Sequence, residues 1–438
     1  MSLPRGWRSA QLKVLCIPVP NTDPTRKPRK RFEYVDIGSI DNVRGRVGQT
    51  KRFLGRDAPT RARRPIQGGD VLFSNVRTYL RNVARVSEEA TARLCSTGFT
   101  VLRPNGSLNS AYLYHYVRSD DFIASVTPKQ TGTHYPATSD RIVLDQSIPV
   151  PPSTKEQEVI GKRLDHIAAR LDSSRHRLDS VQTILRRFRV SVLAAACAGR
   201  LTLHWRSRNR SRSVLEGPQI DQQIDMPELP ASWRYVRLGA LALGLKYGTA
   251  KRCTHDGAGH PVLRIPNIGE GELLSTGMKY GDLPEREYRK LTLEMGDLLL
   301  IRSNGSVSLV GKAALVSREF RGFAYAGYLI RVRPDKKQIL PEYLNYALAS
   351  SAIRLQIEMQ ARSTSGVHNI NSEEVRNLVV PLPPLEEQSE IAERVAVMLQ
   401  QAKGIEQRYQ RAKKLVSKLM PSVLEKAYRG ELIIEKRT

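Results

Sequence analysis

No run of about 18 apolar residues occurs in the 438-residue chain, and a bilayer-spanning helix needs such a run, so no transmembrane helix is expected. The first residues, Met1 to Trp7, contain no apolar stretch of the kind that a secretory signal peptide carries. The four cysteines, Cys16, Cys95, Cys197 and Cys253, are isolated and form no Cys-x-x-Cys pair. A disulfide framework and a zinc site are therefore disfavoured, and a protein of the reducing cytoplasm is predicted.

Motifs of catalysis and nucleotide binding are also missing. Gly305 to Ala313 resembles a phosphate-binding loop, but five residues separate its glycines instead of four, and Ala313 replaces the Ser or Thr that would bind Mg²⁺. We expect a β-turn that leads into a strand. Neither the Asn/Asp-Pro-Pro-aromatic element of an amino-methyltransferase nor a glycine-rich cofactor loop after a strand is present, and the eight histidines form no ligand pattern. No catalytic residue, metal site or bound cofactor is predicted for this chain.

Acidic residues are too few to balance the basic ones. The chain has 70 Lys and Arg against 43 Asp and Glu, a net charge of +27, and an isoelectric point near 10.2. Both halves of the chain are basic, which indicates a polyanionic partner, most often nucleic acid. A soluble protein from an arginine-rich proteome is the alternative, and it is disfavoured because such proteins rarely leave their charge so unbalanced.

Two long segments of the chain are copies of one another. One begins with PLPPLEEQ at residues 381–388, and the other begins with PVPP at residues 149–152 and reaches Glu156-Gln157 after one extra residue. From there the copies run without a gap, so that Gln157 corresponds to Gln388 and Gly199 to Gly430. Helical periodicity continues through both copies, and a helix of about 42 residues is roughly 60 Å long.

Apolar residues recur in both copies at alternating steps of four and three, which is the pattern of a coiled-coil seam. Neither helix can bury such a stripe alone, so we predict that the two helices pack antiparallel and bury each other's. Two unrelated surface helices would not share this spacing. The predicted seam residues are Ile160, Leu164, Ile167, Leu171, Leu178, Leu185, Ile391, Val395, Met398, Ile405, Val416 and Leu419.

The repeat extends upstream of both helices. LPRGW at residues 3–7 returns as LPASW at 229–233, GDVLF at 69–73 returns as GDLLL at 296–300, and STGFTVLRP at 96–104 resembles the segment that ends in GYLIRVRP at 327–334. Each half is therefore a module of about 150 residues followed by a long helix, which indicates duplicated domains because solenoid repeats are far shorter.

Each module is predicted to be rich in short strands with a few helices, so the fold class is α+β with a pseudo-two-fold internal repeat. Strands are expected at 71–74, 83–86, 99–102, 297–301, 312–316 and 328–332, and helices at 111–119 and 341–350. Residues 26–31 indicate an exposed basic loop, and residues 205–218 indicate a mobile linker. The predicted boundaries are 1–152 and 229–383 for the modules, 153–200 and 384–430 for the helices, 201–228 for the linker and 431–438 for a tail.

Two polar loops of each module combine cations, amides, hydroxyls and a flexible glycine. This mixture suits phosphate anchoring together with hydrogen bonding to base edges, although ordinary polar loops are an equally good interpretation of any single residue. His134 and His368 occupy matching places after Gly132 and Gly366, which favours a structural or DNA-facing role over catalysis. The candidate DNA-contacting residues are Arg77, Tyr79, Arg81, Lys129, Gln130, Thr133, His134, Tyr135, Arg302, Ser303, Asn304, Ser306, Arg362, Ser363, His368 and Asn369.

These features together resemble the specificity (HsdS) subunit of a type I restriction–modification enzyme. Two variable β-rich modules, each followed by a proline–Glu-Gln element and a long helix, are similar to that family over essentially the whole chain. VRTYLRNV at 76–83, STGFTVLRP at 96–104 and QTGTH at 130–134 are also similar to phrases of its target-recognition domains. The first proline element departs from the usual form at residues 153–155, which concerns only the start of the first long helix.

The resemblance implies a division of labour. Each target-recognition domain would read one half of a split double-stranded DNA sequence, while the helices would fix the separation and dock two methylation subunits. Those subunits would bind S-adenosylmethionine, and restriction subunits using ATP and Mg²⁺ would join the complex. The alternatives are a basic coiled-coil DNA-binding or scaffolding protein outside any modification system, and a self-sufficient nuclease or methyltransferase. The sequence reveals neither the target bases nor the spacer length.

Overall fold

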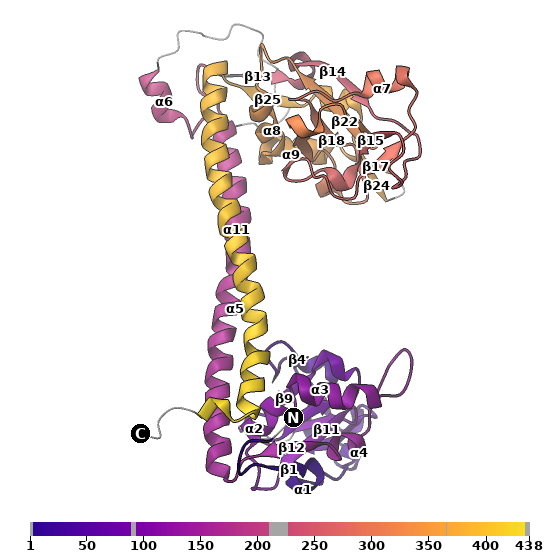
Figure 1. Ribbon diagram of the computed structural model, residues 1–438, viewed down its shortest axis with the longest axis vertical. Coiled ribbons are helices and arrows are strands. Elements are labelled where there is room, and N and C mark those ends of the chain that lie inside the picture. Colours follow the sequence, from indigo (N-terminus) through magenta and orange to yellow (C-terminus); the bar gives the residue numbers. More distant parts are fainter. Residues whose placement is uncertain (1–2, 89–92, 210–226, 365, 434–438) are drawn as a thin grey trace. The chain divides into compact units, whose positions relative to one another are not determined.

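The computed structural model describes residues 3–88, 93–209, 227–364 and 366–433. The chain forms two compact units, one of Met1–Ser180 with Tyr409–Thr438 and one of Val181–Arg408. Each unit contains one module together with a part of each long helix, α5 (Thr154–Cys197) and α11 (Leu385–Tyr428) (Figure 1). Within the described ranges, none of the helices combines the length and apolar character that a membrane span requires.

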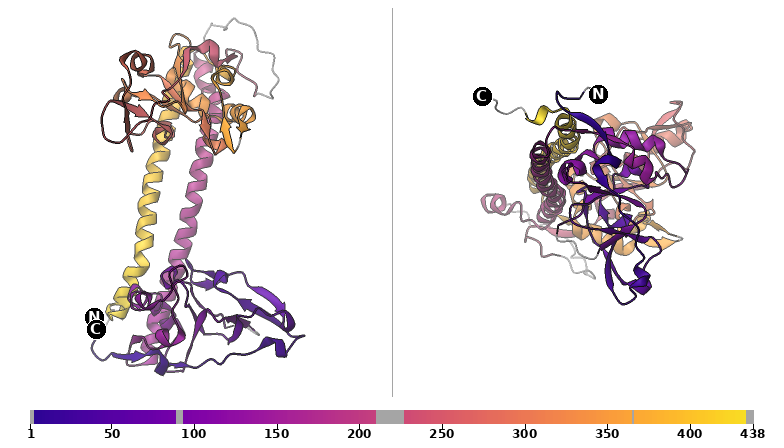
Figure 2. Two further views of the ribbon diagram at one scale, coloured as in Figure 1. Left: turned by 90° about the vertical axis from the view of Figure 1, so that its right-hand side faces the viewer. Right: turned by 90° about the horizontal axis from the view of Figure 1, so that it is seen from below.

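The first unit holds a six-stranded sheet of order β2-β11-β8-β9-β5-β4, a four-stranded sheet of order β6-β3-β10-β7, and the pair β1–β12. Its strands extend away from the first turns of α5 (Figure 2, left). The strands are β1 (Arg8–Gln11), β2 (Cys16–Ile17), β3 (Arg31–Val35), β4 (Ile40–Asp41), β5 (Arg46–Val47), β6 (Lys51–Leu54), β7 (Ala62–Ile66), β8 (Val71–Ser74), β9 (Val83–Arg85), β10 (Arg93–Ser96), β11 (Phe99–Pro104) and β12 (Ser147–Val150). Its short α-helices are α1 (Leu12–Leu15), α2 (Ser110–Tyr116), α3 (Asp120–Val126) and α4 (Asp140–Leu144).

The second unit holds a five-stranded sheet of order β14-β22-β18-β20-β16, two three-stranded sheets, β17-β15-β21 and β19-β24-β23, and the pair β13–β25. The strands are β13 (Arg234–Arg237), β14 (Ala242–Tyr247), β15 (His260–Leu263), β16 (Gly271–Glu272), β17 (Lys279–Gly281), β18 (Leu298–Ile301), β19 (Ser303–Asn304), β20 (Ala313–Leu315), β21 (Ala324–Tyr325), β22 (Leu329–Pro334), β23 (Arg362–Thr364), β24 (Val367–Asn369) and β25 (Val379–Leu382). Its short α-helices are α6 (Leu203–Arg208), α7 (Glu285–Leu291), α8 (Pro341–Ala349), α9 (Ser351–Gln360) and α10 (Ser372–Arg376).

The two modules share one topology. The order β2-β11-β8-β9-β5 corresponds to β14-β22-β18-β20-β16, and the parallel pair β3–β10 corresponds to β15–β21. The strand predicted at 71–74 is present with those ends, and the other strands and helices predicted inside the modules are present with shifted ends. Residues 307–309 form a short 3₁₀ turn that leads into β20. The α+β class and the internal repeat are confirmed.

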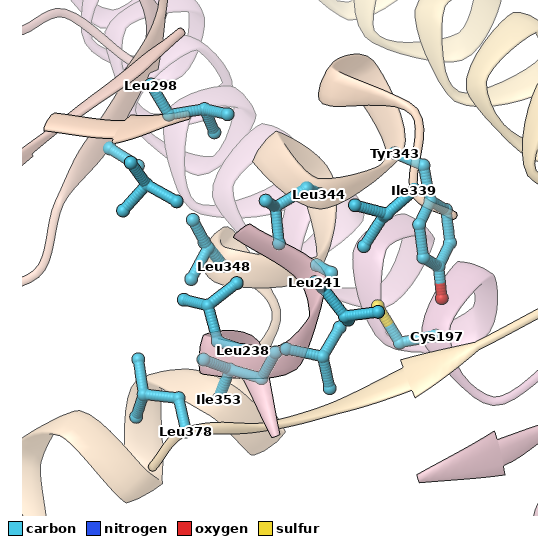
Figure 3. Close-up of a cluster of buried hydrophobic side chains, with 14 of the residues drawn as sticks. Cys197, Leu238, Leu241, Leu298, Ile339, Tyr343, Leu344, Leu348, Ile353 and Leu378 are labelled. Carbon is cyan, nitrogen blue, oxygen red and sulfur yellow. The ribbon is translucent and has the colours of Figure 1, made fainter. Parts of the chain in front are cut away.

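The central strands are buried on both faces, because β8 and β18 are short, nearly continuous apolar runs whose residues are all buried. In the second unit, leucines from β18, α8 and the segments before β14 and β25 form one core, and Cys197 at the end of α5 lies at its edge beside Leu241 and Tyr343 (Figure 3). Apolar packing in this core attaches the second module to the end of α5.

The Glu-Gln element joins each module to the helix that follows it. The side-chain oxygen of Gln157 accepts a hydrogen bond from the amide of Asn109 at 2.8 Å, and that of Gln388 accepts one from Leu340 at 2.7 Å. Both amides precede a short helix, α2 or α8, whose first N–H groups need partners outside the helix. The Gln of each element therefore accepts a hydrogen bond at the start of a short helix of the module, while the element itself begins a long helix.

The two long helices pack antiparallel in each unit. Ile160 and Leu164 near the start of α5 share a core with Leu424 and Ala427 near the end of α11. In the second unit, residues near the end of α5, including Val192, share a core with Ile391 and Val395 near the start of α11. Antiparallel packing of the two copies is thus confirmed.

The predicted seam is wrong at two positions. Ile160, Leu164, Leu171, Leu185, Ile391 and Val395 are buried, and Ile167, Leu178, Met398 and Val416 are half-buried, but Ile405 is 48% exposed and Leu419 is 46% exposed. Half-buried Glu406, which pairs with Arg189 at 2.8 Å, lies inward in place of Ile405. Met420 packs on the core in place of Leu419, because the stripe advances by four residues there instead of three.

The predicted linker begins as ordered structure. Helix α6 occupies residues 203–208, and Arg206 pairs with the buried carboxylate of Glu387, so the expectation of a mobile segment from residue 205 is wrong at its start. Residues 210–226 of that linker lie outside the described residues.

Candidate nucleic-acid interface

The two polar loops of the first module meet through backbone contacts. We call residues 74–82 and 129–137 loop pair 1. Val76 forms a β-bridge with Ala137, and Ala137 forms another with Thr131. The amide of Arg77 also donates to the carbonyl of Pro136 at 2.8 Å. The structure therefore brings together two predicted contact loops that are about fifty residues apart in the sequence.

Arg77 and Arg81 hold left-handed backbone conformations, with φ of 47° and 54°. Such a conformation costs a non-glycine residue roughly 1–2 kcal/mol, and it persists where the surroundings fix it, often at ligand sites. Between them lies a short 3₁₀ turn whose Thr78 is buried, with its hydroxyl 2.8 Å from that of Thr127. The turn leaves the next side chain, Tyr79, 51% exposed.

Arg77 and Tyr135 form a preorganised pair on loop pair 1. The guanidinium lies 4.9 Å from the ring centroid of Tyr135 and donates to the carbonyl of His134 at 3.2 Å. Tyr135 is 73% exposed, and Thr133 and His134 are also exposed. A cation stacked on an exposed aromatic ring presents both a charge and a flat surface, which suits contact with phosphates and bases.

Three other predicted contact residues of loop pair 1 have partners within the protein. Arg81 forms an ion pair with Asp120. The Lys129 ammonium donates to Gln146 at 3.1 Å, and the Gln130 amide donates to the carbonyl of Pro136 at 2.9 Å. These side chains shape the loops.

The corresponding loops of the second module also meet. We call residues 301–306 and 362–369 loop pair 2. Strand β19 pairs with β24, so that Ser303 lies opposite Asn369 and Asn304 opposite His368, and β24 pairs with β23. The arrangement matches the bridges of loop pair 1, with Gly366 at φ 78° in the hairpin turn. The frame is therefore repeated although the side chains differ.

Loop pair 2 presents its own cation and polar groups. The Arg302 guanidinium lies 4.5 Å from the ring centroid of Tyr247. The side-chain oxygen of Asn304 accepts from the amide of Ser306 at 2.9 Å. His368 is half-buried, and its Nδ1 has no hydrogen-bond partner among the described residues. The side chains of Arg362 and Ser363 lie outside the described part of the chain.

Two residues that support the loops were not predicted from the sequence. Tyr247, which stacks on Arg302, lies far upstream of it. Asp140 accepts hydrogen bonds from Asn75 at 2.9 Å and Thr100 at 2.8 Å, and pairs with Arg64. Burial acts to raise the pKa of Asp140, but these hydrogen bonds outweigh it and hold the pKa below its ordinary value. Long-range partners of this kind leave no local pattern in the sequence.

The described residues contain no group of three or more His, Cys, Asp or Glu side chains that could hold a metal ion. Burial raises the pKa of Cys16, Cys95 and Cys197 to about 12, so these thiols are not nucleophilic near neutral pH.

Comparison with known proteins identifies the family. The model of the type I restriction modification DNA specificity domain matches residues 10–183 and again residues 231–413. The chain is 28% identical to the type I restriction enzyme EcoKI specificity subunit of Escherichia coli K12, over 99% of this chain and 91% of that one. It is 27% identical to the StySPI specificity subunit of Salmonella potsdam over the same shares.

Solved structures agree with this assignment. One comes from work on "complex assembly and conformational transition of the type I R-M system"; it matches 98% of this chain and all of its own with a TM-score of 0.77 at 27% identity. The HsdS subunit of Thermoanaerobacter tengcongensis matches with a TM-score of 0.62 at 27% identity, over 98% of each chain. Because the family model covers both modules and much of both long helices, the chain belongs to the family of type I restriction–modification DNA specificity subunits.

Proposed function

We propose that each unit of this specificity subunit reads one half of an asymmetric, bipartite DNA sequence. The observation that carries the proposal is the repetition of one loop frame with unlike side chains. Loop pair 1 presents exposed Tyr79 and Tyr135, whereas loop pair 2 has Ser303 and Asn304 on β19. Equal frames with different contact groups suit two separate readings of base edges.

The long helices would set the spacer between the half-sites and dock two methylation subunits. If both half-sites are read from one face of the duplex, their centres would lie about one helical turn apart, roughly 34 Å. The DNA-contacting roles of the predicted residues remain part of this proposal. Among them we assign direct contact to half-buried Arg77 and to exposed Tyr79, Thr133, His134 and Tyr135. We assign loop support to Arg81, Lys129 and Gln130.

Methylation and cleavage of the DNA would be catalysed by partner subunits. The methylation subunits would bind S-adenosylmethionine and flip the target adenine out of the duplex. Restriction subunits would supply ATP- and Mg²⁺-dependent cleavage. A scaffolding protein outside a modification system is not favoured, because the relatives above are named as specificity subunits.

Methylome sequencing of a host that expresses this chain with its methylation partner tests the proposal. We expect one methylated motif with two unlike defined halves and an unread spacer. A host with the partner alone is the control, and it should show no such motif. A single continuous motif, or methylation without sequence preference, would contradict the proposal.

A separate experiment tests whether the long helices set the length of the spacer. Insertion of four residues near Gly199 should lengthen the spacer and leave both half-sites intact. A change in the bases recognised, with the spacing preserved, would show that the helices do not set the distance.

A further inference from the structure

A cluster of six exposed cations lies outside loop pair 1. We call it the basic loop. Among the described residues, Arg56 is the one member with an ion pair, to Asp57 at 3.6 Å, and that pair is itself exposed. The members are Arg26, Lys27, Arg29, Lys30, Arg31 and Arg56.

The basic loop is held in one shape by backbone contacts. The amide of Gly55 donates to the carbonyl of Lys30 at 2.9 Å, and that of Arg56 donates to Pro28 at 3.2 Å. A Cβ at Gly55 would lie 2.2 Å from the carbonyl oxygen of Lys27, so this close approach requires glycine. The cations are therefore fixed near one another before any partner arrives.

Fixing like charges together is unfavourable in the free protein, because the folded chain cannot spread them apart. A polyanion offsets this repulsion, and a loop whose backbone is already held loses little backbone freedom on binding. The array thus has the properties of a preorganised phosphate-binding surface.

Hydrogen bonds connect the basic loop to loop pair 1. The amide of Asn75 donates to Gly98 at 2.8 Å, and the amide of Thr97 donates to Arg61 at 2.9 Å. In β7, which begins directly after Arg61, the carbonyl of Arg63 accepts from Thr22 at 2.7 Å. The guanidinium of Arg63 pairs with Asp23, just before the basic loop. The two surfaces are thus parts of one connected framework.

The matching place in the second unit carries fewer cations, with Lys251 and Arg252 farther upstream of the strand. Strand β15 pairs in parallel with β21, as β3 does with β10. The six residues before β15, at 254–259, are Thr-His-Asp-Gly-Ala-Gly and contain neither Lys nor Arg.

We infer that the basic loop binds the phosphate backbone of DNA flanking the half-site that the first unit reads. The first unit then supplies a sequence-independent share of affinity through this loop, and the second unit has no six-cation counterpart among its described residues. This inference rests on the proposed function, because it requires loop pair 1 to be at the DNA.

The test is a triple variant, Lys27→Gln, Arg29→Gln and Lys30→Gln, in the complex with the methylation subunits. The control is Arg286→Gln, Arg289→Gln and Lys290→Gln, which removes three exposed cations from α7, where Glu285 and Glu287 already neutralise part of the charge. Binding of duplex DNA is measured over a range of salt, for the methylome-defined target and for a duplex with one half-site scrambled.

Each lost phosphate contact lowers the slope of log affinity against log salt by about 0.9, so the triple variant should lower it by about 2 to 3. Its affinity for target and scrambled duplexes should fall by the same factor, which leaves their ratio unchanged. Shortening the flank beside the first half-site should weaken the parent complex and have little effect on the triple variant. The control variant should behave as the parent.

Two outcomes would overturn the inference while the proposed function stands: an unchanged salt slope in a complex that still prefers its target, or loss of the methylation subunits on size-exclusion chromatography, which would assign the basic loop to an acidic protein surface. If the parent complex itself shows no preference for the target, the proposed function fails first.

Discussion

Both units attach their modules to the long helices through a hydrogen bond from a Trp to a Glu. The surroundings of that Glu differ between the two units. Trp233 donates to Glu387 at 2.8 Å, and Trp7 donates to the matching Glu156 at 3.2 Å. Glu387 is buried and also accepts from Thr202 at 2.6 Å and pairs with Arg206. Glu156 is half-buried, and the residue that corresponds to Arg206, Arg437, lies outside the described residues. The two copies therefore share the Trp–Glu contact, which we call the joint, but differ in how deeply its carboxylate is buried.

A second difference lies at the candidate DNA interface. Loop pair 1 depends on left-handed arginines around a short turn, whereas loop pair 2 is a regular hairpin joined to β19. At the other end of β8 and β18 the two units carry the same Arg–Asp pair: Arg103 holds Asp70 and Arg333 holds Asp297, each through two hydrogen bonds of 2.7 to 2.8 Å. The frame is therefore tolerant of very different loops.

The largest expected effect is on specificity. Replacing residues 229–380 with the corresponding module of a relative should replace one half-site completely and leave the other half-site and the spacer as they were, because each loop pair lies within one unit. The methylome of the host provides the measurement, and exchange of the first module is the matched control. If either exchange altered both half-sites, the units would not read separately.

The Glu387 joint should be far more important for stability than its counterpart. Glu387→Ala should lower the free energy of unfolding of the second unit by about 3–5 kcal/mol, because Arg206 is left without its partner in a largely buried site. Glu156→Ala, at a half-buried site, should cost about 1 kcal/mol. Chemical denaturation with a probe in each unit compares the two variants. Equal costs would show that the extra partners of Glu387 contribute nothing.

The helix seam gives the next contrast. Leu171 is 8% exposed, so Leu171→Asp should cost several kcal/mol through desolvation of an unpaired charge. Leu419→Asp, at a position that is 46% exposed, should change stability by no more than about 0.5 kcal/mol. Thermal unfolding of both variants distinguishes them, and identical melting would contradict the assigned seam.

The smallest expected effect is a pH dependence confined to the first unit. Burial lowers the pKa of His115, although its hydrogen bond to Asp165 at 2.8 Å acts in the opposite direction. The unfolded chain then takes up a proton before the folded one does. The contribution is fully present above about pH 6.5 and declines as the pH falls, by at most about 1.4 kcal/mol per pH unit.

Tyr346 follows Tyr343 as His115 follows Tyr112, and burial raises the pKa of Tyr346, so the second unit has at this place no group that titrates between pH 5 and 7. Unfolding of each unit between pH 7 and 5, followed in the parent and in His115→Gln, measures the effect. A pH profile that His115→Gln leaves unchanged would assign the dependence to other groups.

Sequence patterns predicted the frame well because its parts are repeated. The paired Trp and Glu-Gln elements were visible as copies. At both joints the Trp contacts the Glu, and the Gln contacts the residue before α2 or α8. The strand runs were visible because nearly every residue in them is apolar. Periodicity alone could not place Ile405 and Leu419, since a shift from three to four residues depends on which partner lies opposite.

The candidate interface was less predictable. Its loops could be selected by composition, but not their internal partners. Arg81 looked free in the sequence and is paired with Asp120, and Tyr247 carried no signal although it supports Arg302. The basic residues at 26–31 were visible as a run, but their fixed shape depends on Gly55, which belongs to another segment.

The division of the long helices between the units has a consequence for synthesis. The second unit, residues 181–408, is continuous in the chain, whereas the first needs residues 409–433 to complete its core. Tyr428 donates a hydrogen bond to the carbonyl of Tyr112 at 2.9 Å, and its ring lies 5.1 Å from that of Tyr112. On the ribosome, the half that is made first is therefore the half that closes last, when the final helix leaves the exit tunnel.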